Sequence, residues 1–195
     1  MAEVTRALLA SSNEHKAREL ERLLPGWRIE RVPDGVEFPP EIGDTFAENA
    51  LAKARFVRTL APPDAWVLGE DSGIEVEALG GDPGIHSARW AGGDEVGRML
   101  AAMEGKENRR ARYVSALAAI APNGGESVVA GTFEGTIAEA SSGSEGFGYD
   151  PVFVPDGETQ TVAALGNEWK SQHSHRASAA RQLLETLGSD PESKA

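Results

Sequence analysis

The first part of the chain alternates between segments typical of strands and segments typical of helices, and this alternation limits the fold more than any other feature. Residues 4–10 form an apolar run typical of a buried strand, and polar turn residues follow at 11–13. Residues 14–24 carry their apolar side chains on one side, as an amphipathic helix does, and residues 27–32 resemble a second strand. Strands that alternate with helices favour an α/β fold.

The rest of the chain adds paired strands to this pattern. The further elements that the sequence predicts are a helix from a capping box at Thr45 to about residue 60, a strand over 66–69 that ends at Glu70, extended chain over 74–79, a glycine-rich loop over 80–93, a helix over 95–104, strands over 111–121 and 127–137 joined by a turn at 123–125, extended chain over 151–154, and a helix that Ser174 caps and Gly188 ends. We therefore expect a mixed, strongly twisted sheet flanked by helices, in a single α/β domain over 1–188 with a polar tail over 189–195.

Composition narrows the class of protein. The 195 residues, 40% of them hydrophobic, suit one globular core, and the absence of cysteine excludes disulfides and thiolate metal sites. There is no long apolar run and no signal-peptide core, so we expect a cytoplasmic protein without a membrane partner. The net charge of −12 disfavours nucleic acid, but it suits a divalent cation. A small anion can still bind where a few cations converge.

The turn between the first strand and the first helix is the first candidate site. Its residues are Ser11, Ser12, Asn13, Glu14, His15 and Lys16. A helix N-terminus offers unpaired N–H groups and partial positive charge, so this turn with Lys16 can cradle a phosphate, although it lacks the glycines of a Walker A loop. The alternative is an ordinary helix cap.

Two adjacent carboxylates, Glu70 and Asp71, follow a predicted buried strand, and Glu41 lies in the preceding loop. Mg²⁺ prefers one or two carboxylates together with water and phosphate oxygens. Because successive side chains point to opposite sides of an extended chain, one carboxylate can bind a metal while the other lies behind it or meets a second ion. The alternative is a plain turn at residues 71–73.

Residues 146–151, Gly-Phe-Gly-Tyr-Asp-Pro, form a rigid turn rather than a helix. Phe147 can stack on a nucleobase and Tyr149 can form a pocket wall, unless both rings fill the core. His175 and Arg176 begin the last helix, where cations oppose the helix dipole, and Lys170 is near. These cations indicate an anionic or hydrogen-bond-accepting partner, or else a solvated helix start.

Taken in order, these clusters resemble the inosine triphosphate pyrophosphatase family, also called XTP/dITP diphosphatases. The resemblance covers the chain from the first strand to the last helix. The motifs that carry it are Ser12-Asn13-x-x-Lys16, Glu41, Thr45-Phe46-x-Glu48-Asn49-Ala50, Lys53-Ala54, Asp71-Ser72-Gly73, Ala78-Leu79-Gly80-Gly81-x-Pro83-Gly84, Ser87-Ala88-Arg89, Gly146 to Pro151, Lys170 and Ser174-His175-Arg176.

The resemblance implies Mg²⁺-dependent hydrolysis of deaminated purine nucleotides (ITP, dITP and XTP) to the monophosphate and pyrophosphate. It also implies a homodimer and a two-lobed fold with the active-site cleft between the lobes. The implied site residues are Ser11 to Lys16 for the triphosphate, Glu41 and Asp71 for the metal with Glu70 as a further candidate, Asp71 as proton acceptor, and Ser72, Phe147, Gly148, Tyr149, Asp150, Lys170, His175 and Arg176 for the substrate. The chain departs from the family's commonest pattern at Glu70, His86 and Trp169.

These residues suggest a mechanism in which Asp71 deprotonates or orients the attacking water while Lys16 holds the phosphates. Donors from Arg176 or His175 would meet the 6-oxo group of the purine, which adenine lacks. Two alternatives stay open: the Maf-like nucleotide pyrophosphatases, and a nucleotide-binding regulator without catalysis. A Nudix hydrolase and a serine hydrolase are disfavoured because their motifs, Arg-Glu-x-x-Glu-Glu and Gly-x-Ser-x-Gly, are missing.

Overall fold

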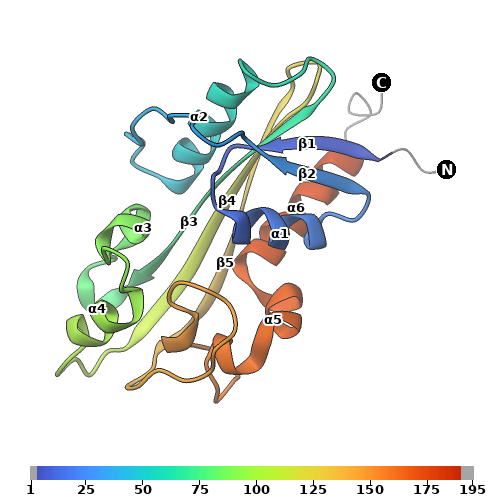
Figure 1. The fold of residues 1–195 in the computed structure, drawn as a ribbon. Helices are drawn as coiled ribbons and strands as arrows, with labels where there is room; N and C mark the ends of the chain where they lie inside the picture. The colour runs from blue at the N-terminus through green and yellow to red at the C-terminus, as the bar shows by residue number, and fades with distance from the viewer. Residues whose placement is uncertain (1–3, 190–195) are drawn as a thin grey trace. The chain divides into compact units, whose positions relative to one another are not determined.

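A computed structural model describes residues 4–189 and contains a six-stranded sheet in the order β2-β1-β3-β4-β5-β6 (Figure 1). Its strands are β1 (Thr5–Leu9), β2 (Trp27–Arg31), β3 (Trp66–Val76), β4 (Arg110–Ile120), β5 (Glu126–Ile137) and β6 (Phe153–Pro155). Strand β1 pairs in parallel with β2 and β3, whereas β5 pairs with β6 in antiparallel fashion. The prediction of a mixed α/β sheet is therefore confirmed.

The described chain forms two compact units. The first unit comprises residues 1–71, 115–131 and 176–195, of which residues 1–3 and 190–195 are outside the described part, and the second unit comprises residues 72–114 and 132–175. Strands β3, β4 and β5 each contribute residues to both units.

The core of the first unit joins the sheet to two helices, α1 (Glu14–Leu23) and α6 (His175–Ser189). Leu20 of α1 and Leu183 of α6 are fully buried together with Leu9, Leu68 and Leu117 of the strands. The apolar side of the predicted first helix is thus the side that packs. Asn13 caps α1, because its side-chain oxygen accepts the N–H groups of His15 and Lys16 at 2.9 and 3.3 Å.

Helix α2 (Phe46–Arg58) begins at the predicted capping box. The Thr45 hydroxyl accepts the N–H of Glu48, and the Glu48 carboxylate accepts the N–H of Thr45, both at 3.1 Å. The helix then passes very close to β3, since a Cβ added at Gly69 would lie 2.0 Å from the carbonyl oxygen of Ala50. Only glycine permits this approach, which holds α2 against the strand that carries Glu70 and Asp71.

Strand β3 is longer than the sequence predicted. It runs without a break over Trp66–Val76, so the predicted end at Glu70 and the alternative of a turn at residues 71–73 are both wrong. The physical reason is a change of partner: β1 pairs with β3 only as far as Leu68, and β4 is the neighbour on the other side. Glu70 and Asp71 therefore lie inside a strand, just beyond the point where its parallel neighbour ends.

The second unit contains several short helices where the sequence predicted extended chain or loop. They are η1 (Glu77–Leu79), η2 (Gly84–His86), α3 (Ser87–Trp90) and η3 (Asp150–Val152). Helix α4 (Glu95–Ala102), by contrast, lies within the predicted helix over 95–104. The prediction of extended chain over 74–79 is right only to Val76, and the predicted loop over 80–93 includes η2 and α3. The core of this unit surrounds Ile74, Met99 and Phe153, all fully buried.

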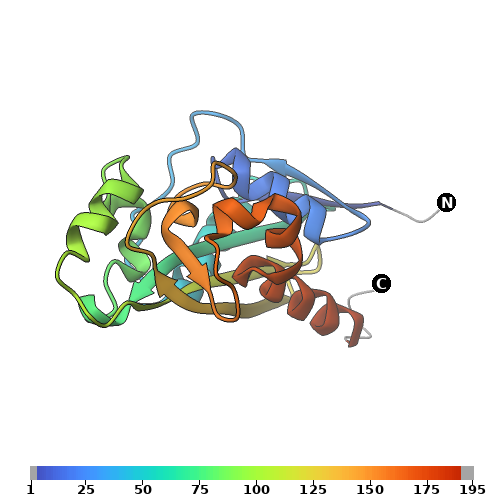
Figure 2. The same cartoon turned by 90° about the horizontal axis from the view of Figure 1, so that it is seen from below.

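Helix α5 (Val162–His173) was not predicted, because its sequence has no sustained apolar stripe and contains Gly166 in a non-helical conformation. Figure 2 shows α5 beside the segment that carries η3, and the two elements are in contact. Helix α6 follows at once and continues through Gly188 to Ser189, so Gly188 does not end it. Apart from Ser189, the predicted tail lies outside the described residues.

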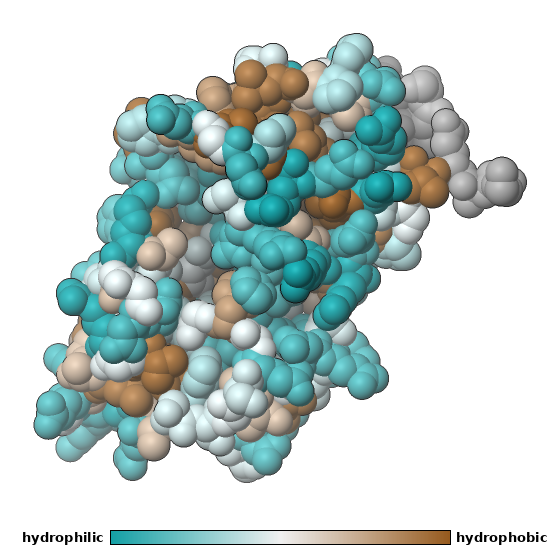
Figure 3. All heavy atoms as spheres, in the orientation of Figure 1, coloured by the Kyte–Doolittle hydropathy of each residue, from teal (hydrophilic) through white to brown (hydrophobic). Residues whose placement is uncertain are grey.

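The surface seen in Figure 3 is mostly hydrophilic, with apolar residues in separate patches. Among the helices of residues 4–189, none is both long and apolar enough to cross a membrane.

Candidate active site

Glu70 is the centre of a buried group of charges in the first unit. Its side chain is fully buried, and its Oε2 lies 2.6 Å from the ammonium of Lys16. Its Oε1 accepts hydrogen bonds from Arg176, through Nη2 at 3.0 Å and Nε at 3.2 Å, and from the Ser115 hydroxyl at 2.9 Å. Burial alone would raise the pKa of Glu70, but Lys16 and Arg176 hold it well below its usual value.

Arg176 is buried as well. Besides Glu70 it donates to the carboxylate of Glu19, which lies on α1 one turn after Lys16. Burial opposes the charge of Arg176, but the two carboxylates raise its pKa above the ordinary value. The predicted residues Lys16, Glu70 and Arg176 are thus brought together from α1, β3 and α6.

Asp71 belongs to a second group of charges in the same unit. The Lys53 ammonium on α2 donates to Asp71 Oδ1 at 2.8 Å and to Glu41 at 3.0 Å, so it joins the two predicted metal carboxylates. Burial is the largest influence on Asp71 and raises its pKa, against the attraction of Lys53 and Lys16 and with a smaller contribution from Glu41. A raised pKa makes this carboxylate a stronger base than an ordinary aspartate.

The donors present fit a hard divalent cation. Asp71 Oδ2 is buried and accepts no hydrogen bond from the described part of the chain, and the Lys53 ammonium shows that a cation can lie between Glu41 and Asp71. Within residues 4–189 no three His, Asp or Glu side chains are grouped closely enough to hold a metal by themselves. Two carboxylates completed by water and phosphate oxygens are the arrangement that Mg²⁺ prefers.

The turn over residues 11–16 forms the ordinary helix cap. Besides the N–H groups that Asn13 accepts, the Asn13 N–H donates to the Ser11 hydroxyl at 3.1 Å, and the Ser12 carbonyl accepts from Arg31 at 2.7 Å. Glu14 and His15 are exposed, and Glu14 pairs with Arg18 at the surface. The cap orients Lys16 towards Glu70, while binding of a phosphate by this turn stays a prediction.

The second unit holds a separate cluster around Asp150, which is almost fully buried. Its Oδ2 accepts from the Lys170 ammonium at 2.7 Å and from the Phe147 N–H at 2.8 Å. The Lys170 ammonium also lies 4.2 Å from the centre of the half-buried Phe147 ring. Asp150 therefore holds the cation and the ring of this turn in one arrangement.

Tyr113 on β4 connects this cluster to His175. Its hydroxyl donates to Asp150 Oδ1 at 3.2 Å, and its ring stacks on the imidazole of His175, with centroids 4.6 Å apart and planes 8° apart. Five residues of this unit thus form one connected group of side chains: Tyr113, Phe147, Asp150, Lys170 and His175.

Glycine and tyrosine shape the same turn. Gly146 has a φ of 78°, and a Cβ there would lie 2.2 Å from Asp150 Oδ2, so no other residue fits. Tyr149 is buried and its hydroxyl donates to the Ser87 carbonyl at 2.9 Å, while burial raises the pKa of Tyr149 to about 12. The Tyr149 ring therefore packs in the core of this unit. Gly148 adopts a φ of 64°, and Ser72 is half-buried in β3.

Sequence reasoning did not assign a role to Lys53, Glu19, Ser115 or Tyr113. A role for Lys53 could have been predicted from the sequence, because Lys53 lies one helical turn after Asn49 and close to Ala50 and Ala54, all three of which are buried in α2. Glu19, Ser115 and Tyr113 had none, since each meets its partner across a large separation in sequence.

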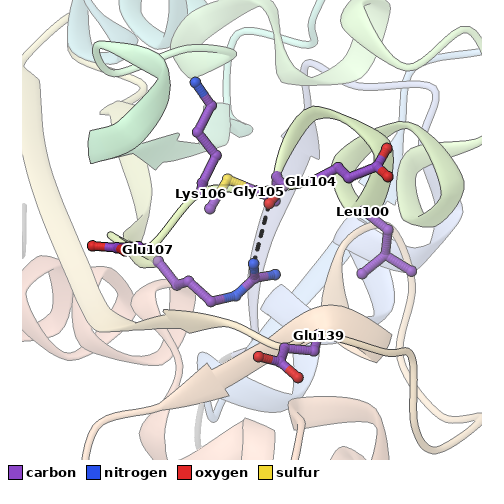
Figure 4. Close-up of a pocket in the computed structure, with 8 residues that line it drawn as sticks. Leu100, Glu104, Gly105, Lys106, Glu107 and Glu139 are labelled. Carbon is purple, nitrogen blue, oxygen red and sulfur yellow. Dashed lines mark hydrogen bonds between the residues drawn. The ribbon is translucent and has the colours of Figure 1, made fainter.

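The second unit also contains a cavity that none of the predicted site residues lines. It has a volume of about 550 Å³ and is lined by Leu100, Met103, Glu104, Gly105, Lys106, Glu107, Arg109 and Glu139 (Figure 4). Arg109 donates to the carbonyl of Met103 there and to those of residues 137 and 138. The arginine thus joins the end of α4 to β5, and the cavity contains none of the predicted site residues.

Comparison with known proteins identifies a family model and relatives that are similar in sequence to this chain. The sequence model of the Ham1 family matches residues 7–186. A protein of Symbiobacterium thermophilum named dITP/XTP pyrophosphatase is 49% identical over 191 residues, which cover 93% of this chain and 94% of that protein. A Thermus thermophilus protein of the same name is 41% identical over 195 residues, covering 95% of this chain and 93% of its own length.

Solved structures agree with the fold. The Ham1 protein of Staphylococcus aureus superposes with a TM-score of 0.81 at 32% identity, covering 94% of this chain and 98% of the other. A nucleoside-triphosphatase, or dITP/XTP pyrophosphatase, of Mycobacterium abscessus gives a TM-score of 0.70 at 39% identity and covers 94% of this chain and all of its own.

Proposed function

Because the chain belongs to the Ham1 family, we propose that it is a pyrophosphohydrolase of deaminated purine nucleoside triphosphates, with dITP, XTP and ITP as substrates. The products are the nucleoside monophosphate and pyrophosphate. The observation that carries the proposal is Asp71: its carboxylate is buried, its pKa is raised, and it is joined through Lys53 to the carboxylate of Glu41. The names of the relatives supply the substrate class.

In this proposal the cofactor is Mg²⁺. Glu41 and Asp71 would hold it, with the unpaired Asp71 Oδ2 as the first protein ligand. When bound, the ion neutralises charge on the phosphate oxygens as pyrophosphate leaves.

The side chains of the first unit act on the phosphates. Lys16 and Lys53 supply positive charge to the triphosphate, and Asp71 takes a proton from the attacking water. The water oxygen forms a bond to the α-phosphorus while the bond from that phosphorus to the bridging oxygen breaks. The pyrophosphate formed carries away the electron pair of the broken bond, and the proton ends on Asp71.

Other side chains act on the base. Phe147 presents a half-buried ring for stacking, which is worth about 1–3 kcal/mol per base. A 6-oxo purine accepts a hydrogen bond that adenine does not accept at that position, and His175 or Arg176 supplies the donor in this proposal. A donor left unpaired in a closed site is costly, so adenine nucleotides are rejected.

We also propose that the enzyme is a cytoplasmic homodimer. The absence of cysteine is compatible with that compartment. Sedimentation of the purified protein at micromolar concentration tests the dimer.

A panel of nucleoside triphosphates with Mg²⁺, scored for pyrophosphate and for orthophosphate, tests the function. We expect pyrophosphate from dITP, ITP and XTP, and little turnover of dATP or dTTP. A preference for dTTP would indicate a Maf-like activity, and the absence of turnover with every nucleotide would indicate a binding protein.

A further inference from the structure

We propose that Glu70 is a positioning residue, which holds Lys16 and Arg176 in place for the substrate and is not a ligand of the metal ion. This inference deepens the proposed function and depends on it for the identity of the substrate.

The contacts of Glu70 differ from those of its neighbour Asp71. Both oxygens of Glu70 already face positive or hydrogen-bond-donating groups, Lys16 at 2.6 Å on Oε2 and Arg176 with Ser115 at 2.9–3.2 Å on Oε1. Among residues 4–189, neither Asp71 Oδ2 nor Glu70 Oε2 accepts a hydrogen bond by geometry, but Glu70 Oε2 is engaged by its ion pair with Lys16. A metal ion at Glu70 would have to displace cations, whereas at Asp71 it would meet an unused oxygen.

The placement of the two residues in β3 explains the difference. Adjacent side chains of a strand point to opposite faces of the sheet. Glu70 points to the face with α1 and α6, which bring Lys16 and Arg176, and Asp71 points to α2, which brings Lys53. The carboxylates therefore serve different groups despite being neighbours in sequence.

The burial of Glu70 makes its hold on the cations strong. Its side chain has no exposure, and those of Arg176 and Lys16 have 2% and 17%. Removal of one member of a buried ion pair leaves the other charge without compensation. With Glu70 neutral, Arg176 keeps Glu19, but Lys16 loses the ion pair that holds its ammonium against β3.

The kinetic test compares Glu70→Gln with Glu41→Gln and Ser115→Ala. We expect Glu70→Gln to raise the KM for dITP about tenfold, the effect of losing one charge-assisted hydrogen bond. Its kcat should fall less than its KM rises, and the Mg²⁺ concentration for half-activation should not change.

Two control variants separate the metal from the cations. Glu41→Gln should raise the Mg²⁺ concentration for half-activation. Ser115→Ala keeps every charge and should have a smaller effect on KM than Glu70→Gln. If Glu70→Gln raised the Mg²⁺ requirement as Glu41→Gln does, the proposal would be overturned.

A second measurement does not depend on turnover. The rate at which acetic anhydride acetylates Lys16, followed by mass spectrometry, should increase in Glu70→Gln, while the rates at Lys53 and at the exposed Lys106 stay the same. An unchanged rate at Lys16 contradicts the proposal even if the enzyme hydrolyses dITP. If Lys16 is acetylated faster in Glu70→Gln but the wild-type protein does not hydrolyse dITP, the positioning by Glu70 is supported and the proposed function is rejected.

A conservative variant covers the case in which Glu70→Gln does not fold. Glu70→Asp keeps the charge but withdraws it by about one methylene length. We expect a smaller rise in KM and in Lys16 acetylation than for the glutamine variant, with no change in Mg²⁺ requirement. Wild-type values of all three quantities would overturn the proposal.

Discussion

At the scale of single residues, Asp71 combines a role in chemistry with a cost in stability. Because burial raises its pKa, the charged carboxylate is less favourable in the folded chain than in the unfolded one. A raised folded pKa means that this cost appears as the pH rises above the unfolded value near 3.8 and is fully present above the folded pKa.

Asp71→Asn should therefore separate activity from stability. We expect turnover of dITP to fall by about 10² or more, the usual contribution of a general base. The midpoint of thermal unfolding at pH 7 should stay the same or rise, since Lys53 keeps Glu41 as a partner. Pyrophosphate release and a thermal melt measure the two effects. Near-normal turnover would remove Asp71 from the mechanism.

Tyr113 permits a test with the loss of a single oxygen. Tyr113→Phe removes the hydroxyl that donates to Asp150 but keeps the ring that stacks on His175. A hydrogen bond to a charged group contributes about 1.5–3 kcal/mol, so we expect the KM for dITP to rise about tenfold or more. The KM for dITP and the thermal midpoint are the measurements. A lower thermal midpoint with unchanged KM would limit Tyr113 to a role in packing.

At the scale of elements, the sequence predicted well wherever local signals decide the structure. The cap at Asn13, the capping box at Thr45 and the hairpin at residues 123–125 depend on neighbouring residues, and α1, α2, β4 and β5 were predicted at nearly their observed bounds. The length of β3 was missed because a strand partner far along the chain determines it. Helix α5 was missed because Gly166 interrupts its pattern.

The contact between α2 and β3 gives a prediction at this scale. Gly69→Ala would push a methyl group into the backbone of α2, with only 2.0 Å to the Ala50 oxygen. Overpacking of this kind costs about 1–3 kcal/mol, and a shift of α2 also displaces Lys53 from Asp71. We expect a loss of both stability and turnover, measured by urea unfolding and pyrophosphate release.

Gly188→Ala is the matched control for that substitution. Gly188 lies in α6, and within residues 4–189 no atom outside its chain neighbours and its own helix backbone lies within 4 Å of its added Cβ. Alanine is favoured over glycine within helices by about 0.5–1 kcal/mol, so stability should be kept or raised. Equal losses in the two variants would mean that the close approach at Gly69 is not the cause.

At the scale of the whole molecule, the candidate site is assembled from segments that are remote in sequence. Residue types such as paired carboxylates and a Gly-Phe-Gly-Tyr-Asp turn could be recognised from the sequence alone, but their partners could not. Glu70 meets Arg176 across 106 positions, and no local pattern encodes such a contact. The sequence thus identified Asp71 and Asp150, whereas the contacts that tune them required the tertiary fold.

The buried charges should also shape how the stability of the protein depends on pH. Glu70 has a folded pKa well below its usual value of 4.5 because Lys16 and Arg176 outweigh its burial. Its contribution to stability is therefore complete above pH 4.5 and is lost as the pH falls towards the folded pKa, where the unfolded chain binds a proton that the folded chain does not. Over this range of pH, the free energy of unfolding should fall with decreasing pH more steeply in the wild type than in Glu70→Gln. The difference between the two slopes should approach about 1.4 kcal/mol per pH unit, which corresponds to about one proton. Urea unfolding of both proteins at a series of pH values between about 3 and 7 measures this difference, a range that brackets the ordinary carboxyl pKa. Parallel curves over the whole range would show that Glu70 does not hold its charge against protonation in the folded state.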